Sequence, residues 1–181
     1  MKVTTTSLPG VLVLSSRIFL DSRGAFWETF NQKAMSEAGL PGPWVQDNFS
    51  LSSKHVLRGI HYQVTQPQGK LIRVTHGAVF DVAVDLRRNS ATFGKHFAIE
   101  LDGESGEMLW IPVGFGHGFL ALTDIVGFAY KVTDYYSPAG ERTVLWNDPE
   151  LGIPWPVQPE AAIVSEKDRA GVLVQAAELF D

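Results

Sequence analysis

The residues with the widest scope for proton transfer near neutral pH are the histidines, at positions 55, 61, 76, 96 and 117. A single histidine in a strand is more often structural than catalytic, and we expect this of three of them: His55, His76 and His96. His61 differs, because two basic residues, Arg58 and Lys70, flank it in a segment that is otherwise apolar enough to be core. Charged groups placed among Val, Leu and Ile need a partner or a bound ligand. His61 and its two flanking cations are therefore candidates for a binding or catalytic site.

Tyr130 is a second candidate for acid–base chemistry. It lies in the segment 126–134 (VGFAYKVTD), where Val126, Phe128 and Val132 share its face of an alternating strand. A buried hydroxyl on such a face needs a hydrogen-bond partner or serves as an acid.

The segment 106–117 has the skeleton G-x5-P-x-G-x2-H, which resembles the second motif of the cupin superfamily of barrels. Metal-binding cupins usually carry Asn four positions after this histidine, where the chain has Ala121. Their first motif contains His-x-His, whose two side chains point to one side of a strand and grip a metal. The chain has His61 followed by Gln63 at these positions, and Gln removes a strong ligand. The sequence therefore predicts a cupin barrel without a metal site.

Composition narrows the classes of function. The 181 residues suffice for one domain, which we expect to span 1–181. The formal net charge is −5 and basic residues are scattered singly, so a nucleic acid polymer is not an expected partner. The chain has no cysteine, which excludes disulfides, thiolate ligands and a cysteine nucleophile. It has no apolar run of membrane-spanning length and no signal-peptide pattern, so we expect a cytoplasmic protein without membrane partners.

The elements that must position these side chains are mostly strands, because apolar residues recur with a period of two. In 78–87 (AVFDVAVDLR), Asp81 and Asp85 alternate with apolar residues, which predicts a half-buried strand, and 96–101 alternates in the same way. Further strands are expected at 11–20, 24–30, 45–53, 56–63, 69–76, 107–111, 117–122, 126–134 and 143–147.

Helices are few in this sequence. The segment 32–39 predicts a helix, with Asn31 as its N-cap and Gly39 and Pro41 as its stop. A short helix over 168–178 is also expected. Many short strands with few helices favour a sandwich or barrel, and a jelly roll is the first choice. The interior of such a barrel is a natural place for a small ligand.

Several ordered segments together resemble the dTDP-4-dehydrorhamnose 3,5-epimerases, the RmlC-like branch of the cupin superfamily. The match runs from about Gly10 to Asp168 and rests on segments 21–24, 46–48, 57–63, 68–71, 79–85, 111–119, 130–136, 146–149 and 165–168. The resemblance implies a mainly β fold, a cupin-type double-stranded β-helix or jelly-roll barrel with a few short helices.

The resemblance also implies base and acid chemistry on a dTDP-4-keto-6-deoxyhexose, with no cofactor. The 4-keto group acidifies the hydrogens at C3 and C5. His61 is implied as the base, and Asp168 as the carboxylate that orients its ring and stabilises the imidazolium. Lys70 would lie near the O4 atom of the enolate, where a fixed ammonium contributes several kcal/mol. Tyr130 would donate the proton from the opposite face of the sugar.

Substrate-binding residues follow from the same resemblance. Arg23 and Arg58 would clamp the diphosphate, and Tyr136 would stack on the thymine. His117 would support binding near the reacting sugar or act on it directly, and both readings stay open. The remaining matched positions would line the nucleotide site: Glu28, Gln46, Asp47, Asn48, Glu141 and Lys167. In this family the N-terminal strand crosses to a partner subunit, which implies a homodimer in which Arg23 and Glu28 serve the neighbour's site.

The expected reaction converts dTDP-4-keto-6-deoxy-D-glucose to dTDP-4-keto-L-rhamnose in dTDP-L-rhamnose biosynthesis. A mono-epimerase that inverts only C3 or C5 for an antibiotic deoxysugar is the first alternative, because the same base and acid serve both reactions. A metal-dependent cupin enzyme, which Gln63 and Ala121 disfavour, and a non-catalytic sugar-nucleotide-binding barrel are further alternatives. The use of the product, in cell-wall polysaccharide, lipopolysaccharide or a secondary metabolite, is left open by the sequence.

Overall fold

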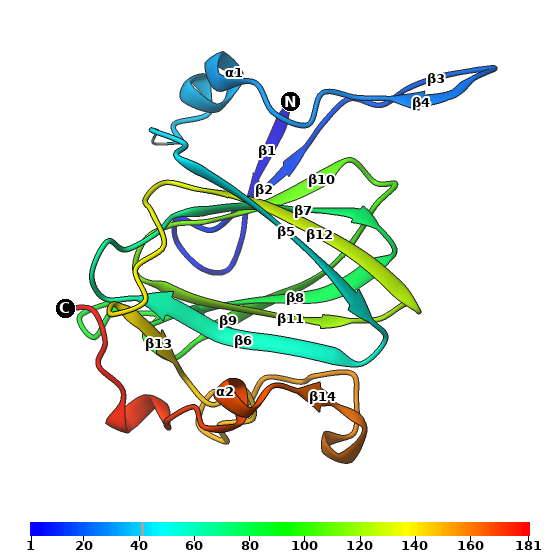
Figure 1. Cartoon of the computed structure of the whole chain (residues 1–181). Helices are drawn as coiled ribbons and strands as arrows, with labels where there is room; N and C mark the ends of the chain where they lie inside the picture. The colour runs from blue at the N-terminus through cyan, green and yellow to red at the C-terminus, as the bar shows by residue number, and fades with distance from the viewer. Residues whose placement is uncertain (41) are drawn as a thin grey trace.

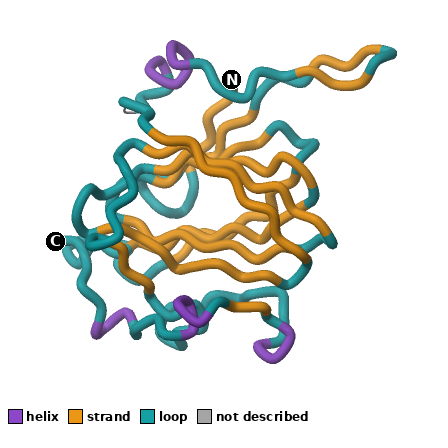
Figure 2. Tube along the Cα trace, viewed as in Figure 1, coloured by secondary structure: helices purple, strands orange, loops and turns teal. Residues whose placement is uncertain are grey.

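The computed structural model describes residues 1–40 and 42–181, which form two β-sheets packed face to face (Figure 1). The strand order is β1-β2-β10-β7-β12-β5 in one sheet and β13-β6-β11-β8-β9 in the other, with β14 paired in parallel to β6. The strands form two layers, and the short helices lie outside them (Figure 2). The predicted mainly β, jelly-roll barrel of the cupin type, with a few short helices, is confirmed.

The first sheet contains β1 (Lys2–Thr5), β2 (Leu12–Ser15), β10 (Glu107–Ile111), β7 (Lys70–His76), β12 (Ile125–Val132) and β5 (Gln46–Ser53). The second contains β13 (Glu141–Thr143), β6 (Val56–Gln63), β11 (Phe115–Ala121), β8 (Ala78–Asp85), β9 (His96–Asp102) and β14 (Ile163–Val164). A separate hairpin, formed by β3 (Phe19–Asp21) and β4 (Gly24–Phe26), projects from the barrel in Figure 1.

Three of the predicted strands differ from the structure. The segment 11–20 is not one strand but two, because the chain leaves the first sheet after β2 and starts the projecting hairpin at β3. The segment 24–30 forms a strand only as far as Phe26, where pairing with β3 ends. Instead of 143–147, the strand is β13, which pairs with β6 and ends at Thr143.

The helix prediction over 32–39 is confirmed as α1 (Gln32–Glu37). The Asn31 side chain accepts hydrogen bonds from the N–H groups of Lys33 and Ala34, as an N-cap does, and Gly39 follows with φ +76°. The predicted stop at Pro41 lies outside the described residues. No helix among the residues described has the length and apolar character needed to cross a bilayer.

The predicted helix over 168–178 is wrong. The segment contains the end of α2 (Glu166–Arg169) and a separate 3₁₀ turn (Val174–Ala176). A further 3₁₀ turn spans Pro159–Ala161. Between α2 and the second turn the backbone is extended, because the N–H of Val172 donates to the carbonyl of Thr143, the last residue of β13. Pairing with a distant segment thus overrides the local helical pattern.

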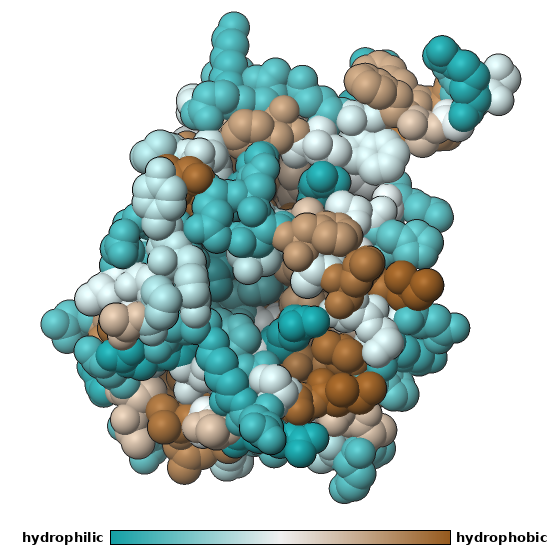
Figure 3. Space-filling model, viewed as in Figure 1, coloured by the Kyte–Doolittle hydropathy of each residue, from teal (hydrophilic) through white to brown (hydrophobic). Residues whose placement is uncertain are grey.

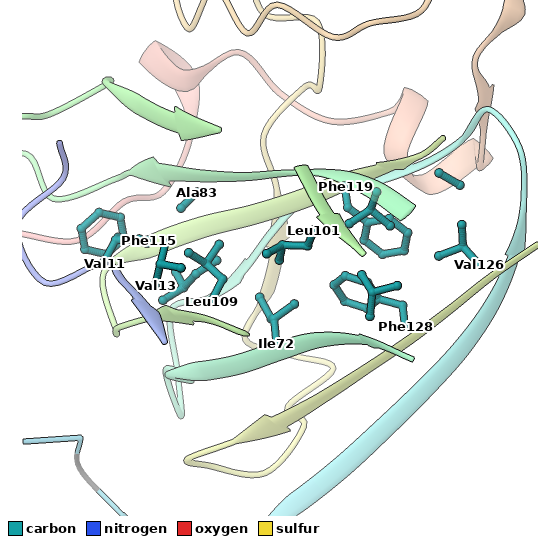
Figure 4. Close-up of a cluster of buried hydrophobic side chains, with 14 of the residues drawn as sticks. Val11, Val13, Ile72, Ala83, Leu101, Leu109, Phe115, Phe119, Val126 and Phe128 are labelled. Carbon is teal, nitrogen blue, oxygen red and sulfur yellow. The ribbon is translucent and has the colours of Figure 1, made fainter. Parts of the chain in front are cut away.

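The hydrophobic core lies between the two sheets, as Figure 4 shows. It is formed by inward side chains of both layers: Ile72, Leu109, Val126 and Phe128 from the first sheet, and Ala83, Leu101, Phe115 and Phe119 from the second. The predicted face of 126–134 that carries Phe128 and Tyr130 is confirmed, since Tyr130 packs against this core from a half-buried position.

β8 is buried on both faces, which corrects the half-buried prediction for 78–87. Val82 and Val84 pack beneath the C-terminal segment rather than in the barrel. Asp81 and Asp85 are both 0% exposed. Asp81 pairs with His117, whereas Asp85 accepts hydrogen bonds from a surrounding set of side chains, Arg87, Ser90 and Thr92. The alternation located the polar face correctly, but that face meets buried polar partners instead of water.

Candidate active site

A cavity of about 350 Å³ lies between the sheets, and side chains from β5, β6, β7, β11, β12 and β13 contribute to its wall. Many of the predicted site residues line it: Asn48, Arg58, His61, Lys70, His117, Tyr130, Tyr136 and Glu141. Residues spread over nearly a hundred positions of the sequence are therefore brought to one space by the barrel.

His61 and Asp168 form a close pair at this cavity. The distance from His61 Nε2 to Asp168 Oδ1 is 2.5 Å, and Asp168 is only 3% exposed. Asp168 lies in the first turn of α2, where its N–H donates to the Ser165 N-cap hydroxyl. Burial alone would raise the pKa of Asp168, but the hydrogen bond and charge of His61 lower it on balance. The carboxylate thus holds the proton on Nε2 and leaves Nδ1 as the basic nitrogen.

Gly59 allows β6 to pack closely against its neighbour β11 beside this pair. Its φ is +129°, and a Cβ at this position would lie 2.5 Å from the Cα of Gly118 on the neighbouring strand β11. Only glycine fits such a close backbone approach with this φ. The N–H of Gly59 lies 3.4 Å from Asp168 Oδ2, so the second carboxylate oxygen also has a donor.

His117 faces His61 directly across the β6–β11 pair and forms a second buried couple with Asp81. Its Nε2 lies 3.1 and 3.0 Å from the two carboxylate oxygens of Asp81. Burial lowers the pKa of His117, although Asp81 opposes the shift. The ring, which stacks on Phe128, is therefore neutral near pH 7 and donates to Asp81. Sequence reasoning missed Asp81; its place on the polar face of an apolar strand was the available signal.

Lys70 brings a positive charge into the same cavity from β7. Its Nζ donates to the carbonyl of His61 at 3.4 Å. Burial lowers the pKa of Lys70 to about 8, while the charges of Asp81 and Glu141 act in the opposite direction. An ammonium that is buried and only partly neutralised is suited to stabilise a negative charge that develops nearby.

Tyr130 lies on β12 and packs beside Phe128, with ring centroids 6.2 Å apart. Burial raises the pKa of Tyr130 above its usual value, and Glu141 adds to the shift while Arg58 opposes it. The phenol therefore stays protonated near neutral pH and can donate a proton within the cavity.

A chain of polar contacts joins the cavity rim to the helix that carries Asp168. Tyr136 Oη donates to one carboxylate oxygen of Glu141 at 2.7 Å, and Lys167 Nζ lies 2.5 Å from the other. Burial would raise the pKa of Glu141, but these two hydrogen bonds lower it on balance. Gln46 accepts from the N–H of Tyr136 and donates to Asn48, so it contacts the loop of Tyr136.

Three predicted binding residues lie away from this cavity in the single chain. Asp47 is on the opposite face of β5 and pairs with Lys131 at 2.8 Å. Arg23, at the hairpin tip, is exposed and pairs with Asp21. Glu28 accepts a hydrogen bond from the Asn31 side chain. Over residues 1–40 and 42–181, no three or more His, Asp or Glu side chains are grouped so as to hold a metal ion.

Comparison with known proteins shows which family the chain is similar to. The sequence model of the family described as dTDP-4-dehydrorhamnose 3,5-epimerase matches residues 5–176. The chain is 51% identical over 181 residues to the dTDP-4-dehydrorhamnose 3,5-epimerase of Pseudomonas aeruginosa, with 99% of each chain covered. It is 51% identical to the Escherichia coli enzyme of the same name, covering 93% of this chain and 91% of that one. Among solved structures it is similar to the dTDP-6-deoxy-D-glucose-3,5-epimerase RmlC of Legionella pneumophila in complex with dTDP-4-keto-L-rhamnose, with a TM-score of 0.95, 44% identity, and coverage of 98% and 94%.

Proposed function

Because the chain belongs to the dTDP-4-dehydrorhamnose 3,5-epimerase family, we propose that it inverts C3 and C5 of dTDP-4-keto-6-deoxy-D-glucose with the residues of the cavity described above. It is thus an isomerase that acts on a nucleotide-linked sugar. The observation that carries the assignment of its chemistry is the 2.5 Å contact between His61 Nε2 and Asp168 Oδ1 at the cavity wall. This contact pairs a base with the carboxylate that orients it.

In the first step His61 removes the proton from the carbon beside the 4-keto group. The Nδ1 atom accepts this proton, because Nε2 already donates to Asp168. The buried carboxylate then faces an imidazolium and stabilises its charge.

The electrons of the broken C–H bond move onto O4 of the sugar and form an enolate. We assign Lys70 to this oxygen, because its buried ammonium lies in the same cavity as His61 and 3.4 Å from the carbonyl oxygen of that residue. His117 is neutral and held by Asp81, which suits a hydrogen-bonding contact with the sugar better than a second proton transfer. Both residues thus act on the substrate that His61 deprotonates.

In the last step Tyr130 donates its phenolic proton to the opposite face of the same carbon, which inverts that carbon. The raised pKa of Tyr130 supports the protonated state that this step requires. The substrate stays tethered by its nucleotide while the sugar ring presents C3 and C5 in turn.

Replacing Tyr130 with Phe is expected to separate proton exchange from inversion. His61 still removes a proton, but it can return solvent deuterium only to the face from which that proton came. We expect deuterium incorporation to continue while formation of the inverted sugar falls roughly 10²-fold, the usual size of a general-acid effect. Mass spectrometry and NMR of the recovered sugar measure both rates. A parallel loss of exchange and inversion would contradict the role of Tyr130 as the opposing acid alone.

The nucleotide part is assigned to the remaining polar side chains of the cavity and its rim. We assign the diphosphate to Arg58, whose guanidinium lies on β6 and donates to the Ser52 hydroxyl. The exposed ring of Tyr136 is suited to stack on thymine. The other predicted contacts at this rim come from a set of polar side chains: Gln46, Asn48, Glu141 and Lys167.

The protein is proposed to be a homodimer that exchanges its N-terminal hairpins. Leu20 and Phe26 on the hairpin are 79% and 71% exposed, which is unusual for large apolar residues. In Figure 3 the projecting hairpin carries hydrophobic surface. A groove of about 540 Å³ on the outer face of β5, β12 and β7, which includes Asp47 and Phe49, is a fitting place for a second copy. Exchange would bring Arg23 and Glu28 to the neighbour's cavity.

Co-expression of two inactive variants tests this exchange. Arg23→Ala and His61→Asn, each alone, are expected to lose most activity. In a mixed dimer one site combines the intact His61 of one chain with the intact Arg23 of the other. Random pairing makes half of the dimers mixed, so we expect about a quarter of the parent activity. Activity no greater than the average of the two separate variants would show that Arg23 serves its own chain.

Incubation of the protein with dTDP-4-keto-6-deoxy-D-glucose in D₂O tests the reaction itself. We expect deuterium at both C3 and C5, because each carbon is deprotonated and reprotonated during inversion. Label at one carbon only would make the protein a mono-epimerase. No label at either carbon would contradict the proposed function.

Two earlier predictions stay predictions. A single domain over 1–181 agrees with the span of the family match, and isolation of a stable shorter fragment would test it. Cell fractionation would test the predicted cytoplasmic location.

A further inference from the structure

Gln63, at the end of β6, has a side-chain amide that is engaged on both of its ends. The residue is 6% exposed. Its Nε2 donates to the carbonyl of Gln66 at 2.7 Å and to the carbonyl of Tyr135 at 3.2 Å, while its Oε1 accepts from the N–H of Ser137 at 3.0 Å. The bonds to Tyr135 and Ser137 hold the loop that joins β12 to β13, residues 133–140, which we call the tyrosine loop.

Two other glutamine side chains hold the same loop through its backbone. Gln68 donates to the carbonyl of Asp134 at 2.8 Å, and Gln46 accepts from the N–H of Tyr136 at 3.1 Å. The glutamines come from β5, β6 and the turn after β6, so the loop is fixed from different elements. Tyr136 nevertheless remains 51% exposed. The backbone is thus anchored while the Tyr136 ring is presented to the cavity.

Gln63 lies on the same strand as His61, the proposed catalytic base, and so links the tyrosine loop to that strand. It stands two residues after His61 on β6, and residues at i and i+2 of a strand lie on the same face. In the antiparallel pair of β6 and β13, Gln63 lies opposite Glu141, whose carboxylate accepts the hydrogen bond of Tyr136 Oη. One strand therefore sets the position of the base and of the loop that carries Tyr136.

We propose that Gln63 is a positioning residue for nucleotide binding: it fixes the tyrosine loop so that the Tyr136 ring stands where the thymine of the substrate stacks. It acts on binding and not on proton transfer. A neutral histidine, the metal ligand at this position in metal-binding cupins, has one donor and one acceptor and could not make these three bonds. The inference rests on the proposed function, which supplies the nucleotide.

The test replaces Gln63 with Met, which has a similar shape and makes none of these hydrogen bonds. Ser137 and Tyr135 then lose buried partners, and we expect the loop to move toward water. Binding of dTDP, measured by calorimetry, should weaken about tenfold, and KM should rise by a similar factor. The value of kcat and the deuterium exchange rate at saturation should stay within about twofold of the parent.

Three further variants make the result specific. Gln66→Met removes one exposed hydrogen bond to the Asp134 side chain and leaves the contacts of the three glutamines to the backbone of the tyrosine loop in place, so it should bind dTDP as the parent does. The double variant Gln63→Met with Tyr136→Ala should bind dTDP no more weakly than Tyr136→Ala alone, because Gln63 acts through Tyr136. If Gln63→Met does not fold, Gln68→Met removes one anchor of the loop and should show the same pattern at smaller size.

The inference is overturned if Gln63→Met binds dTDP as tightly as the parent. It is also overturned if the loss of dTDP affinity caused by Gln63→Met adds fully to the loss caused by Tyr136→Ala. The same holds if kcat of Gln63→Met falls by as large a factor as its KM rises. Failure of the proposed function would look different, because the parent protein itself would then bind no dTDP.

Discussion

Replacing His61 with Asn is expected to lower kcat for epimerisation by roughly 10³-fold, within the range that a general base contributes. Asn fits the same space and can still donate to Asp168, so the buried carboxylate keeps a partner. It has no basic nitrogen, however, and cannot accept the proton from C3 or C5. Deuterium exchange should fall as far as turnover, because both begin with this step.

His76→Asn is the matched control for this result. His76 lies at the exposed end of β7 and does not line the cavity, so its replacement should leave kcat unchanged. Binding of dTDP by His61→Asn should also stay close to the parent value, which separates loss of the base from loss of the fold. If His61→Asn kept more than about a tenth of the parent exchange rate, another group would have to be the base.

Replacing Lys70 with Met is expected to lower kcat by roughly 10²- to 10³-fold, the usual effect of removing one stabilising group from an oxyanion. The ammonium is needed in its charged form. Since the pKa of Lys70 is about 8, kcat/KM of the parent should fall as the pH rises through that value. Tyr130 does not account for this fall, because its pKa is raised above the usual value of a phenol.

The pH profiles of two variants test this assignment. Residual activity of Lys70→Met should show no fall near pH 8. Lys70→Arg keeps a cation that does not titrate in this range, so whatever activity it retains should also lack the fall. An unchanged alkaline fall in Lys70→Met would assign that titration to another group.

The same Lys70→Met replacement should stabilise the fold at pH 7. The pKa of Lys70 is lower in the folded protein than in the unfolded chain, so its charge opposes folding at every pH below about 8. This cost declines as the pH rises from about 8 to the usual lysine value. Denaturant unfolding at pH 7 should therefore show a higher free energy of unfolding for Lys70→Met. Lower activity with higher stability would show that the variant fails through chemistry and not through folding.

Local features were predictable because they depend on neighbours in the chain. The period of two located most strands, and the Asn31 side chain capped α1 as its type and position indicated. The segment 168–178 shows the limit of such reasoning, because pairing of Val172 with a distant segment replaced the expected helix. β1 was not predicted at all, since its four residues are exposed and lack an apolar face.

The site was predictable in part, and through resemblance more than through pattern. The types and order of His61, Lys70, Tyr130 and Asp168 matched a known family, but no local rule joins residues 107 positions apart. Asp81 was missed because an acidic residue alternating with apolar ones is ordinarily expected to face water. The use of Gln63 as a loop anchor was likewise invisible, since its partners are backbone groups of Tyr135 and Ser137.

The sequence by itself therefore determined the strand-rich barrel, the side chains able to exchange protons, and the loss of the cupin metal motif at Gln63. Only the tertiary structure decided that His61 meets Asp168, that His117 meets Asp81, and that three glutamines fix the tyrosine loop. The physical reason is that periodicity and capping arise from short-range geometry, whereas these contacts depend on strand register. The pairing of β6 with β11 places His61 opposite His117. The Ser165 N-cap fixes the first turn of α2, from which Asp168 reaches His61 on β6.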